Sequence, residues 1–486
     1  MTEQLIILII VWPLLAGVLT ALLPCRENLL SAWGIFNLLA CNAMGLGLVR
    51  LVLAQGSTSY HISGWAPPLG IELKVTVFSA LLSWLISAVA LFGFVGGRRT
   101  WADQIGERLP QFLSLFFLLV AAFEGLCLSN DAFNLYVMLE ISSLATYGLI
   151  AFGGGRAYLA TFHYIVMGTI GASFYLIGVG YLYIKTGTLN ITALAHMIAE
   201  TELTQAYLLA LCFLITGILL KMAVFPLHFW LPNAYTYAPA ATSLLVGPLS
   251  TKLAVFLLFR IMMDIFGGVL PSLHPTWSFV IVGLASVGIL VGTSLALAQY
   301  DLKKTFACLI VAEAGYMLGG LWLTDPRGTV GALFHLVNDA IATLVLFLVV
   351  IAIQSSVGGK KLSDLKGLFQ KSPLTAVALI LVAFNLIGVP PTAGFFSKAT
   401  LMTGAIASGR FEFVIALLLA SLGNLVIFFR IIEQAYFQPQ DNSEAGRSKD
   451  GQRAGAFALA IGSLLVMLGL SAYPVMETFI RPVVHL

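Results

Sequence analysis

An almost entirely apolar stretch, residues 217–260, constrains this chain more than any other part of it. Lys221 and Lys252 lie in this stretch, and a charge at the centre of a bilayer costs about 3 kcal/mol or more. Proline frees backbone carbonyl groups, which are tolerated at membrane depth only beside protein or water. The stretch therefore predicts a hydrated break in a membrane helix at which ions are handled. Its prolines are Pro226, Pro232, Pro239 and Pro248, and its histidine is His228.

The composition of the whole chain is that of an integral membrane protein. Charged residues make up 10% of it, against about 25% in soluble domains, and 59% of the residues are hydrophobic. The net charge of +3, without a basic stripe, argues against nucleic acid as a partner.

Sequence motifs for cofactor or metal chemistry are absent. The five cysteines are isolated and form no C-x-x-C, which argues against iron–sulfur clusters, zinc and disulfide frameworks. The sequence also contains no H-E-x-x-H and no phosphate-binding loop of the G-x-x-x-x-G-K-[ST] type. We therefore expect no metal, no cofactor, no ATP-driven transport and no enzymatic activity in this chain itself.

Apolar segments long enough to cross a membrane follow one another along the sequence. A span needs about 20 apolar residues, which predicts about fourteen spans and an all-α polytopic membrane protein. No basic residue precedes the first span, so it is predicted to be retained rather than removed as a signal peptide. Residues 438–453 are polar and are expected to form a solvated, mobile loop. The predicted spans are residues 4–24, 29–53, 73–97, 110–129, 131–153, 157–184, 206–226, 237–263, 276–298, 305–323, 328–354, 373–406, 411–437 and 454–480.

Lysine and arginine are distributed unevenly between the two sets of loops. The loops that follow odd-numbered spans carry most of them, which predicts that these loops face the cytoplasm. Both termini then face the outer side of a bacterial-type inner membrane. Lys221, Lys252 and Lys398 belong to neither set of loops and form the predicted intramembrane lysines.

A second proline-containing break occurs at residues 388–398, GVPPTAGFFSK, where Pro390 and Pro391 precede Lys398. Transporters often consist of inverted repeats whose corresponding helices are broken. We therefore predict two inverted five-helix repeats with broken helices 7 and 12. The predicted units are residues 1–109 (helices 1–3), 110–265 (helices 4–8), 266–437 (helices 9–13) and 438–486 (a loop and helix 14).

Glu140 lies in the middle of the fifth predicted span, where a carboxylate needs a cationic partner or a proton. Lys221 is the nearest buried cation of similar depth, so we predict that these two residues pair. Such a pair could be structural and lock two helices together. Alternatively it could move, so that Lys221 keeps its proton while Glu140 is close and releases it when Glu140 withdraws, as a proton pump requires.

Other ionisable residues in the spans indicate a longer polar axis. Lys252 and Lys398 are predicted to lie deep, although a lysine can also extend its ammonium group to the membrane surface. His228 is either a proton relay or a satisfied core histidine. His335 and Asp339 are four residues apart, hence on one helical face, and could extend a relay towards Lys398.

Several polar residues are weaker candidates. His163, Glu124 and Glu313 either face the same axis or are satisfied by neighbouring helices. Lys303 and Lys304 are predicted to lie on a solvated loop. Hydroxyl groups near the charges could hold water or serve as ordinary helix contacts. These are Ser142, Ser143, Thr146, Ser243, Ser250 and Thr251.

Several sequence blocks, in this order, resemble the antiporter-like subunits of respiratory complex I, membrane-bound hydrogenases and Mrp-type sodium/proton antiporters. The blocks are NDAFNLYVMLEISSLATYGLIA, GILLKMAVFPLHFWLPNAYTYAP, LLVGPLSTKLAVFLLFR, DLKKTFACLIVAEAGYML and GVPPTAGFFSKATLM. Within the family, NLYVMLEISSLATY and YLIGVGYLYIKTGTLN look most like the D-type subunit of Mrp antiporters and its hydrogenase counterparts.

The resemblance implies roles for matching positions. Glu140 corresponds to the family's span-5 glutamate, Lys221 to the lysine that pairs with it, Lys252 to the bridging residue of span 8 and Lys398 to the exit lysine of span 12. It also implies two inverted five-helix units, half-channels from each side and a central polar axis.

Four positions depart from the family pattern. Asp339 stands where many relatives have histidine, and Thr343 where many have lysine, so the central relay could run through His335 and water. Asn233 replaces a common aspartate, and His163 replaces a frequent lysine.

The predicted function is proton translocation in a multi-subunit Mrp-type sodium/proton antiporter. Expected partners are other membrane subunits, protons, sodium and lipids. One alternative is an equivalent subunit of a redox-driven complex of the NADH dehydrogenase or membrane-bound hydrogenase type, whose electron carriers lie on other chains. Alternatives of other classes are a stand-alone solute transporter and a scaffold with an inactive channel.

Overall fold

The computed structural model describes residues 3–201, 204–267, 270–436 and 449–484, without the side chains of residues 270–275. The helices of its first half are α1 (Gln4–Leu22), α2 (Glu27–Gln55), α3 (Val77–Gly97), α4 (Trp101–Gln104), α5 (Leu109–Leu128), α6 (Ala132–Ala151), α7 (Arg156–Thr186), α8 (Ile191–Glu200), α9 (Gln205–Met222), α10 (Trp230–Tyr237) and α11 (Ala240–Arg260). Those of its second half are α12 (Leu270–Leu297), α13 (Leu302–Leu321), α14 (Pro326–Val357), α15 (Leu368–Lys371), α16 (Pro373–Ile387), α17 (Ala393–Ala407), α18 (Phe411–Tyr436), α19 (Lys449–Leu470) and α20 (Ala472–Val475). Two short strands, β1 (Thr58–His61) and β2 (Glu72–Val75), pair in antiparallel orientation.

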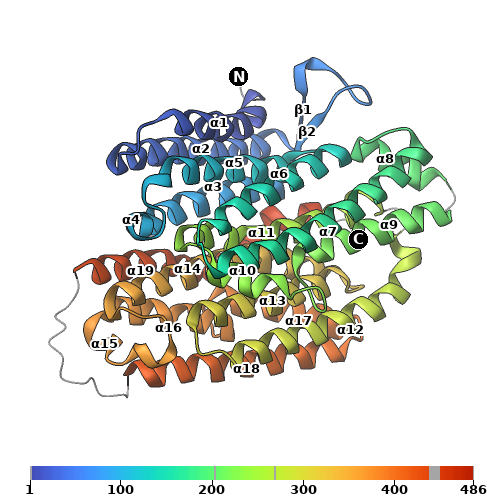
Figure 1. The fold of residues 1–486 in the computed structure, drawn as a ribbon. Helices are drawn as coiled ribbons and strands as arrows, with labels where there is room; N and C mark the ends of the chain where they lie inside the picture. The colour runs from blue at the N-terminus through green and yellow to red at the C-terminus, as the bar shows by residue number, and fades with distance from the viewer. Residues whose placement is uncertain (1–2, 202–203, 268–269, 437–448, 485–486) are drawn as a thin grey trace.

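The long helices lie side by side and run mostly in one direction across Figure 1. The short helices α4 and α15 lie at one end of the bundle, and the β1–β2 hairpin and α8 lie at the other. Helices α11, α13 and α14 occupy the interior, since nearly all their side chains are buried. This arrangement confirms the predicted all-α polytopic membrane protein.

Thirteen helices in the described part of the chain are long and apolar enough to cross a membrane. The remaining predicted span, residues 373–406, consists of α16 and α17, which are 15 residues long each and separated by a break. Several boundaries differ from prediction, among them the end of the last span, 454–480, since α19 ends at Leu470. The third span begins only at Val77, because Glu72–Val75 pairs as β2. Of the predicted loop 438–453, residues 438–448 lie outside the described residues, and Lys449–Arg453 begin α19 instead.

Two cations that were predicted to lie at membrane faces are buried. Lys303, predicted to be solvated, lies in the first turn of α13 and donates a hydrogen bond to the carbonyl of Ala238. Arg260 at the end of α11 donates to the carbonyl of Ser129 and forms an ion pair with Asp264 at 2.9 Å. The prediction that both cations lie at the membrane surface was wrong, because each donates a hydrogen bond to a backbone carbonyl of a segment distant in sequence. The sequence alone does not show such a contact.

The hairpin is fastened to the bundle through Glu72. Its Oε2 accepts hydrogen bonds from Asn130 at 2.8 Å and Asn190 at 2.6 Å, just before α6 and α8. Burial raises the pKa of this carboxyl, but hydrogen bonds from Ser59, Asn130 and Asn190 outweigh it and hold the pKa below its usual 4.5.

Acid should therefore loosen the hairpin. A carboxyl with a lowered folded-state pKa contributes stability above its usual value of 4.5, and this contribution is lost as the pH falls through the lowered value. We expect hydrogen-exchange protection of residues 58–75, corrected for intrinsic rates, to fall between about pH 5.5 and about pH 3. Glu72→Gln should reduce protection at the higher pH and remove the pH dependence; a variant that keeps the full dependence would contradict this assignment.

Helices α7 and α9 cross in very close contact. A Cβ atom added to Gly217 on α9 would lie 2.5 Å from the carbonyl oxygen of Gly171 and 2.8 Å from the backbone nitrogen of Tyr175, both on α7. Small residues permit this approach, as is typical between membrane helices. The contact matters for the site, because Gly217 lies one turn before Lys221 and fixes the end of α9.

Gly217→Ala should destabilise the protein. The new methyl group meets rigid backbone rather than flexible side chains, so we expect a loss of about 1–3 kcal/mol, seen as a lower melting temperature in detergent. Gly180→Ala on α7 is the matched control, because nothing lies within 4 Å of its added Cβ. The control should be neutral or slightly stabilising, since alanine favours the helix by about 1 kcal/mol. Equal melting temperatures for both variants would refute the close crossing.

Candidate functional site

The first break in a membrane helix lies between α9 and α10. Helix α9 ends at Met222, directly after Lys221. The next residue, Ala223, has a left-handed φ of 54°, and the chain becomes helical again only at Trp230. Pro226 lies in this break, where it has no amide hydrogen to continue the helix. The indole of Trp230 donates at 3.2 Å to the carbonyl of Leu220, which also accepts the amide hydrogen of Ala223. The break therefore holds Lys221 at a helix end inside the bundle.

Two other predicted residues of this region lie apart from the charged groups. Pro232 falls inside α10 rather than in the break, so it does not interrupt a helix. His228 is buried, with its ring 4.6 Å from that of Phe229 and 5.8 Å from that of Phe225. Within the described residues, His228 Nδ1 has no hydrogen-bond partner.

Glu140 and Lys221, the N-terminal pair, bring α6 and α9 together. Lys221 Nζ lies 3.7 Å from Glu140 Oε1 and donates a 2.6 Å hydrogen bond to Ser143 Oγ, one turn further along α6. The Lys221 side chain is 8% exposed and that of Glu140 is 27% exposed. The ammonium group is therefore held by a hydroxyl, with the carboxylate at a looser distance.

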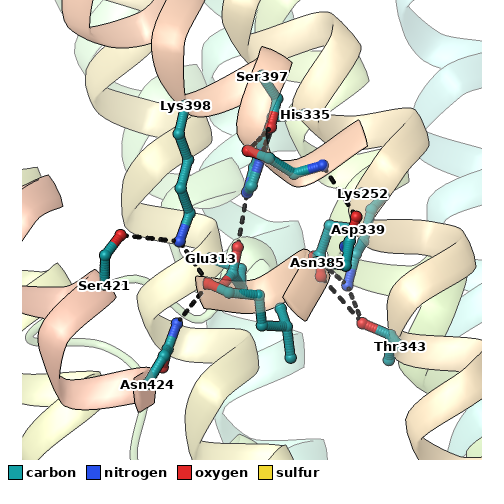
Figure 2. Close-up of polar contacts among 12 residues, drawn as sticks. Lys252, Glu313, His335, Asp339, Thr343, Asn385, Ser397, Lys398, Ser421 and Asn424 are labelled. Atoms are coloured by element: carbon teal, nitrogen blue, oxygen red, sulfur yellow. Dashed lines mark hydrogen bonds and ion pairs between the residues drawn. The ribbon is translucent and has the colours of Figure 1, made fainter. Parts of the chain in front are cut away.

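Lys252 and Asp339, the central pair, join α11 to α14. Lys252 Nζ lies 2.7 Å from Asp339 Oδ2, and their side chains are 0% and 2% exposed. The ammonium group also donates to the carbonyl of Gly247 at 3.3 Å, and Thr343 Oγ1 donates to Asp339 Oδ1 at 3.1 Å. Figure 2 shows Lys252, Asp339 and Thr343 together. Asp339 thus neutralises Lys252 directly, whereas the sequence had assigned it to a relay with His335.

Glu313 and His335, the histidine pair, lie beside the central pair and join α13 to α14 (Figure 2). His335 Nε2 lies 2.6 Å from Glu313 Oε2, and Nδ1 lies 2.9 Å from Ser397 Oγ on α17. Ser397 Oγ also lies 3.0 Å from the carbonyl oxygen of Gly394 on its own helix, which offers its hydroxyl a second acceptor. The 2.6 Å contact between Nε2 and the carboxyl oxygen is a hydrogen bond along which a proton can be held.

Lys398 lies at the second helix break, between α16 and α17. Helix α16 ends at Gly388, whose φ of 92° favours glycine, and Pro390 and Pro391 follow in the break. Lys398 Nζ donates to the carbonyl of Leu386 at 2.5 Å and to Ser421 Oγ at 3.2 Å. Lys398 is thus bound by a backbone carbonyl in the last turn of α16, whereas Lys221 and Lys252 each have a carboxylate partner.

The structure also separates candidates that the sequence could not. His163 is exposed on the outside of α7, away from the buried charges. Glu124 accepts hydrogen bonds from Ser83 at 2.5 Å and Ser87 at 3.1 Å, in a separate cluster between α5 and α3. Glu313, a weaker candidate in the sequence, pairs directly with His335. Its charge within an apolar span was the available signal, the same one that singled out the lysines.

The family follows from sequence comparison. Residues 129–423, more than half of the chain and including all three pairs and Lys398, match the family described as NADH:quinone oxidoreductase/Mrp antiporter, TM. This chain belongs to that family. The family had been predicted from the motifs, and the match confirms it.

Relatives of this antiporter-like chain come from different complexes. The N-type subunit of the NADH-quinone oxidoreductase of Desulforudis audaxviator is 39% identical over 92% of this chain and 90% of the relative. The D-type subunit of the Na(+)/H(+) antiporter of Alkalihalophilus pseudofirmus is 29% identical over 98% and 95%. A chain of the archaeal membrane-bound sulfane sulfur reductase has a TM-score of 0.91 and 26% identity, with coverage of 99% and 97%. The comparisons therefore do not favour the predicted D-type antiporter chain over its counterpart in a redox complex.

The central pair should show strong coupling in a double-mutant cycle. Lys252→Met or Asp339→Leu alone leaves one buried charge unpaired, so we expect each to cost about 3–5 kcal/mol of stability. The double variant removes both charges and should recover most of this loss. Melting temperatures of the purified protein measure the cycle. Breaking the exposed Arg327–Asp325 pair with Arg327→Met is the control and should change the melting temperature little. Additive losses in the cycle would contradict direct pairing.

Proposed function

We propose that this chain translocates protons as one subunit of a multi-subunit membrane complex. The observation that carries the proposal is the series of buried proton-binding groups across the bundle, from the N-terminal pair through the central and histidine pairs to Lys398. Ionisable residues are expensive at membrane depth, and such chains in membrane proteins mark proton relays.

The N-terminal pair is proposed to be the movable part of the relay. Its 3.7 Å ion-pair distance and the partial exposure of Glu140 leave the carboxylate room to withdraw. Ser143 already accepts a hydrogen bond from Lys221, so the ammonium group keeps one partner during such a movement. These features support a switch better than a rigid structural ion pair.

Two kinds of complex fit this function. The 29% identity with a chain of a Na(+)/H(+) antiporter supports an Mrp-type cation/proton antiporter, in which sodium is the exchanged ion. The 39% identity with a chain of a NADH-quinone oxidoreductase supports a redox-driven complex, in which electron transfer on other chains supplies the energy. Tagging this chain and identifying the proteins that co-purify with it from native membranes decides between them. Iron–sulfur or nickel–iron proteins would indicate the redox complex, and small membrane proteins alone would indicate the antiporter.

The charge of the loops supports an orientation for the complex. We propose that the end carrying Lys303, Lys360 and the other loops after odd-numbered spans faces the cytoplasm, and that both termini face the outside of an inner membrane.

Transport by the assembled complex should depend on the N-terminal pair and Lys398. Glu140→Gln, Lys221→Met and Lys398→Met each remove a proton-binding charge, and we expect each to reduce proton transport at least about tenfold. The measurement is the pH-gradient signal of a fluorescent amine in inverted membrane vesicles, energised according to the type of complex.

The matched control is Arg156→Gln, which removes an exposed charge at the start of α7 and should leave transport unchanged. Assembly of the complex must be equal in all variants. Normal transport in both Glu140→Gln and Lys221→Met would rule out the proposed relay and favour an inactive scaffold. Full activity of the chain as an isolated monomer would rule out its assignment to a larger complex and favour a stand-alone transporter.

A further inference from the structure

A polar cavity of about 360 Å³ lies at the proposed cytoplasmic end of the interior helices. Its wall includes Gln104 and Thr236, Ser243 from α11, Gln354 from α14, and the ammonium-bearing Lys303 and Lys360. A cavity of this size with several hydrogen-bonding groups can hold water. It contains none of the residues that the proposed relay uses.

The cavity points along the interface of α11 and α14 towards the central pair. On α14, Gln354 and Phe347 line the cavity, and Thr343 and Asp339 follow at intervals of four residues on the same face. On α11, Ser243 lines the cavity and Gly247, whose carbonyl accepts a hydrogen bond from Lys252, follows one turn later. Both helices thus lead from the cavity to the central pair.

Phe347 occupies the path between the cavity and the pair. A Cβ atom added to Gly247 would lie 2.5 Å from Cε2 of Phe347 and 3.4 Å from Cγ2 of Thr343, so the ring and the threonine both pack directly on Gly247. Phe347 is also fully buried, at 1% exposure. With a rise of 1.5 Å per residue, Asp339 lies about 12 Å beyond Phe347 along α14.

We propose that Phe347 is a hydrophobic gate that separates the water-accessible cavity from the central pair. An apolar constriction excludes water, and without a continuous chain of water or polar groups a proton does not cross it. Displacement of the ring would connect the cavity with Thr343 and then with Asp339. The gate itself is a claim about water access; its consequence for transport rests on the proposed function.

Thiol accessibility tests the gate without any assay of transport. The chain, with its five cysteines replaced by serine or alanine and assembled with its partner proteins, is placed in sealed vesicles with the cavity end exposed to a membrane-impermeant anionic methanethiosulfonate. Gln354→Cys, at a partly exposed position of the cavity wall, should react readily. Thr343→Cys should react slowly beside Phe347 and at least about tenfold faster in combination with Phe347→Ala.

Matched positions separate gating from general loosening. Ala340→Cys lies fully buried on α14 and outside the cavity lining, and should stay unreactive in every background. Phe334→Ala removes an equally buried ring from α14 outside the cavity and should leave Thr343→Cys slow. Phe347→Leu is the milder variant if the alanine variant does not assemble, and should raise the rate by a smaller factor.

Three results would overturn the gate: no reaction at Gln354→Cys, equal reaction of Thr343→Cys with and without Phe347, or equal acceleration at Ala340→Cys. Passive proton leak through the same vesicles then distinguishes the two proposals. Faster labelling with a raised leak supports both. Faster labelling with unchanged leak and transport retains the gate and argues against proton translocation by this chain.

Discussion

The requirement that every charge in the apolar interior have a partner organises this structure. An unpaired charge at membrane depth is too costly to retain, so each buried lysine of the proposed relay fixes a contact between its own helix and another. Lys221 joins α9 to α6, Lys252 joins α11 to α14, and Lys398 joins α17 to α16 and α18. The most buried helices, α11, α13 and α14, are also those that carry the central and histidine pairs.

The two helix breaks extend the same principle to the backbone. A helix that stops inside the bundle leaves carbonyl groups unpaired, and its C-terminal end carries a partial negative charge. Lys221 lies in the last turn of α9, and Lys398 donates to Leu386 in the last turn of α16. The prolines prevent these helices from continuing, so a helix C-terminus with its partial negative charge lies beside each lysine and helps to stabilise it. This explains why proline and lysine occur close together in both apolar stretches.

Much of the fold and of the candidate site could be predicted from the sequence. The length of an apolar segment, and the energetic cost of a charge within it, can both be read from neighbouring residues alone. Apolar length predicted the spans, and charge within them identified Glu140, Lys221, Lys252 and Lys398. Partnership depends on how helices pack, which the sequence does not show. Asp339 was therefore assigned to the histidine four residues away, although it faces a lysine on another helix. For the same reason Lys303 was predicted to be solvated, since the carbonyl that satisfies it belongs to Ala238, far away in the sequence.

The different partners of the buried cations have an electrical consequence. In the histidine pair a proton can move between Nε2 and Glu313 Oε2 without changing the net charge of the pair. The central pair keeps its net charge in the same way, as an ion pair or after transfer within it. Lys398 differs, because its ammonium group is held by a carbonyl and a hydroxyl, which carry no formal charge. The membrane voltage acts on net charge, so within this row of groups it acts most directly on the protonated Lys398.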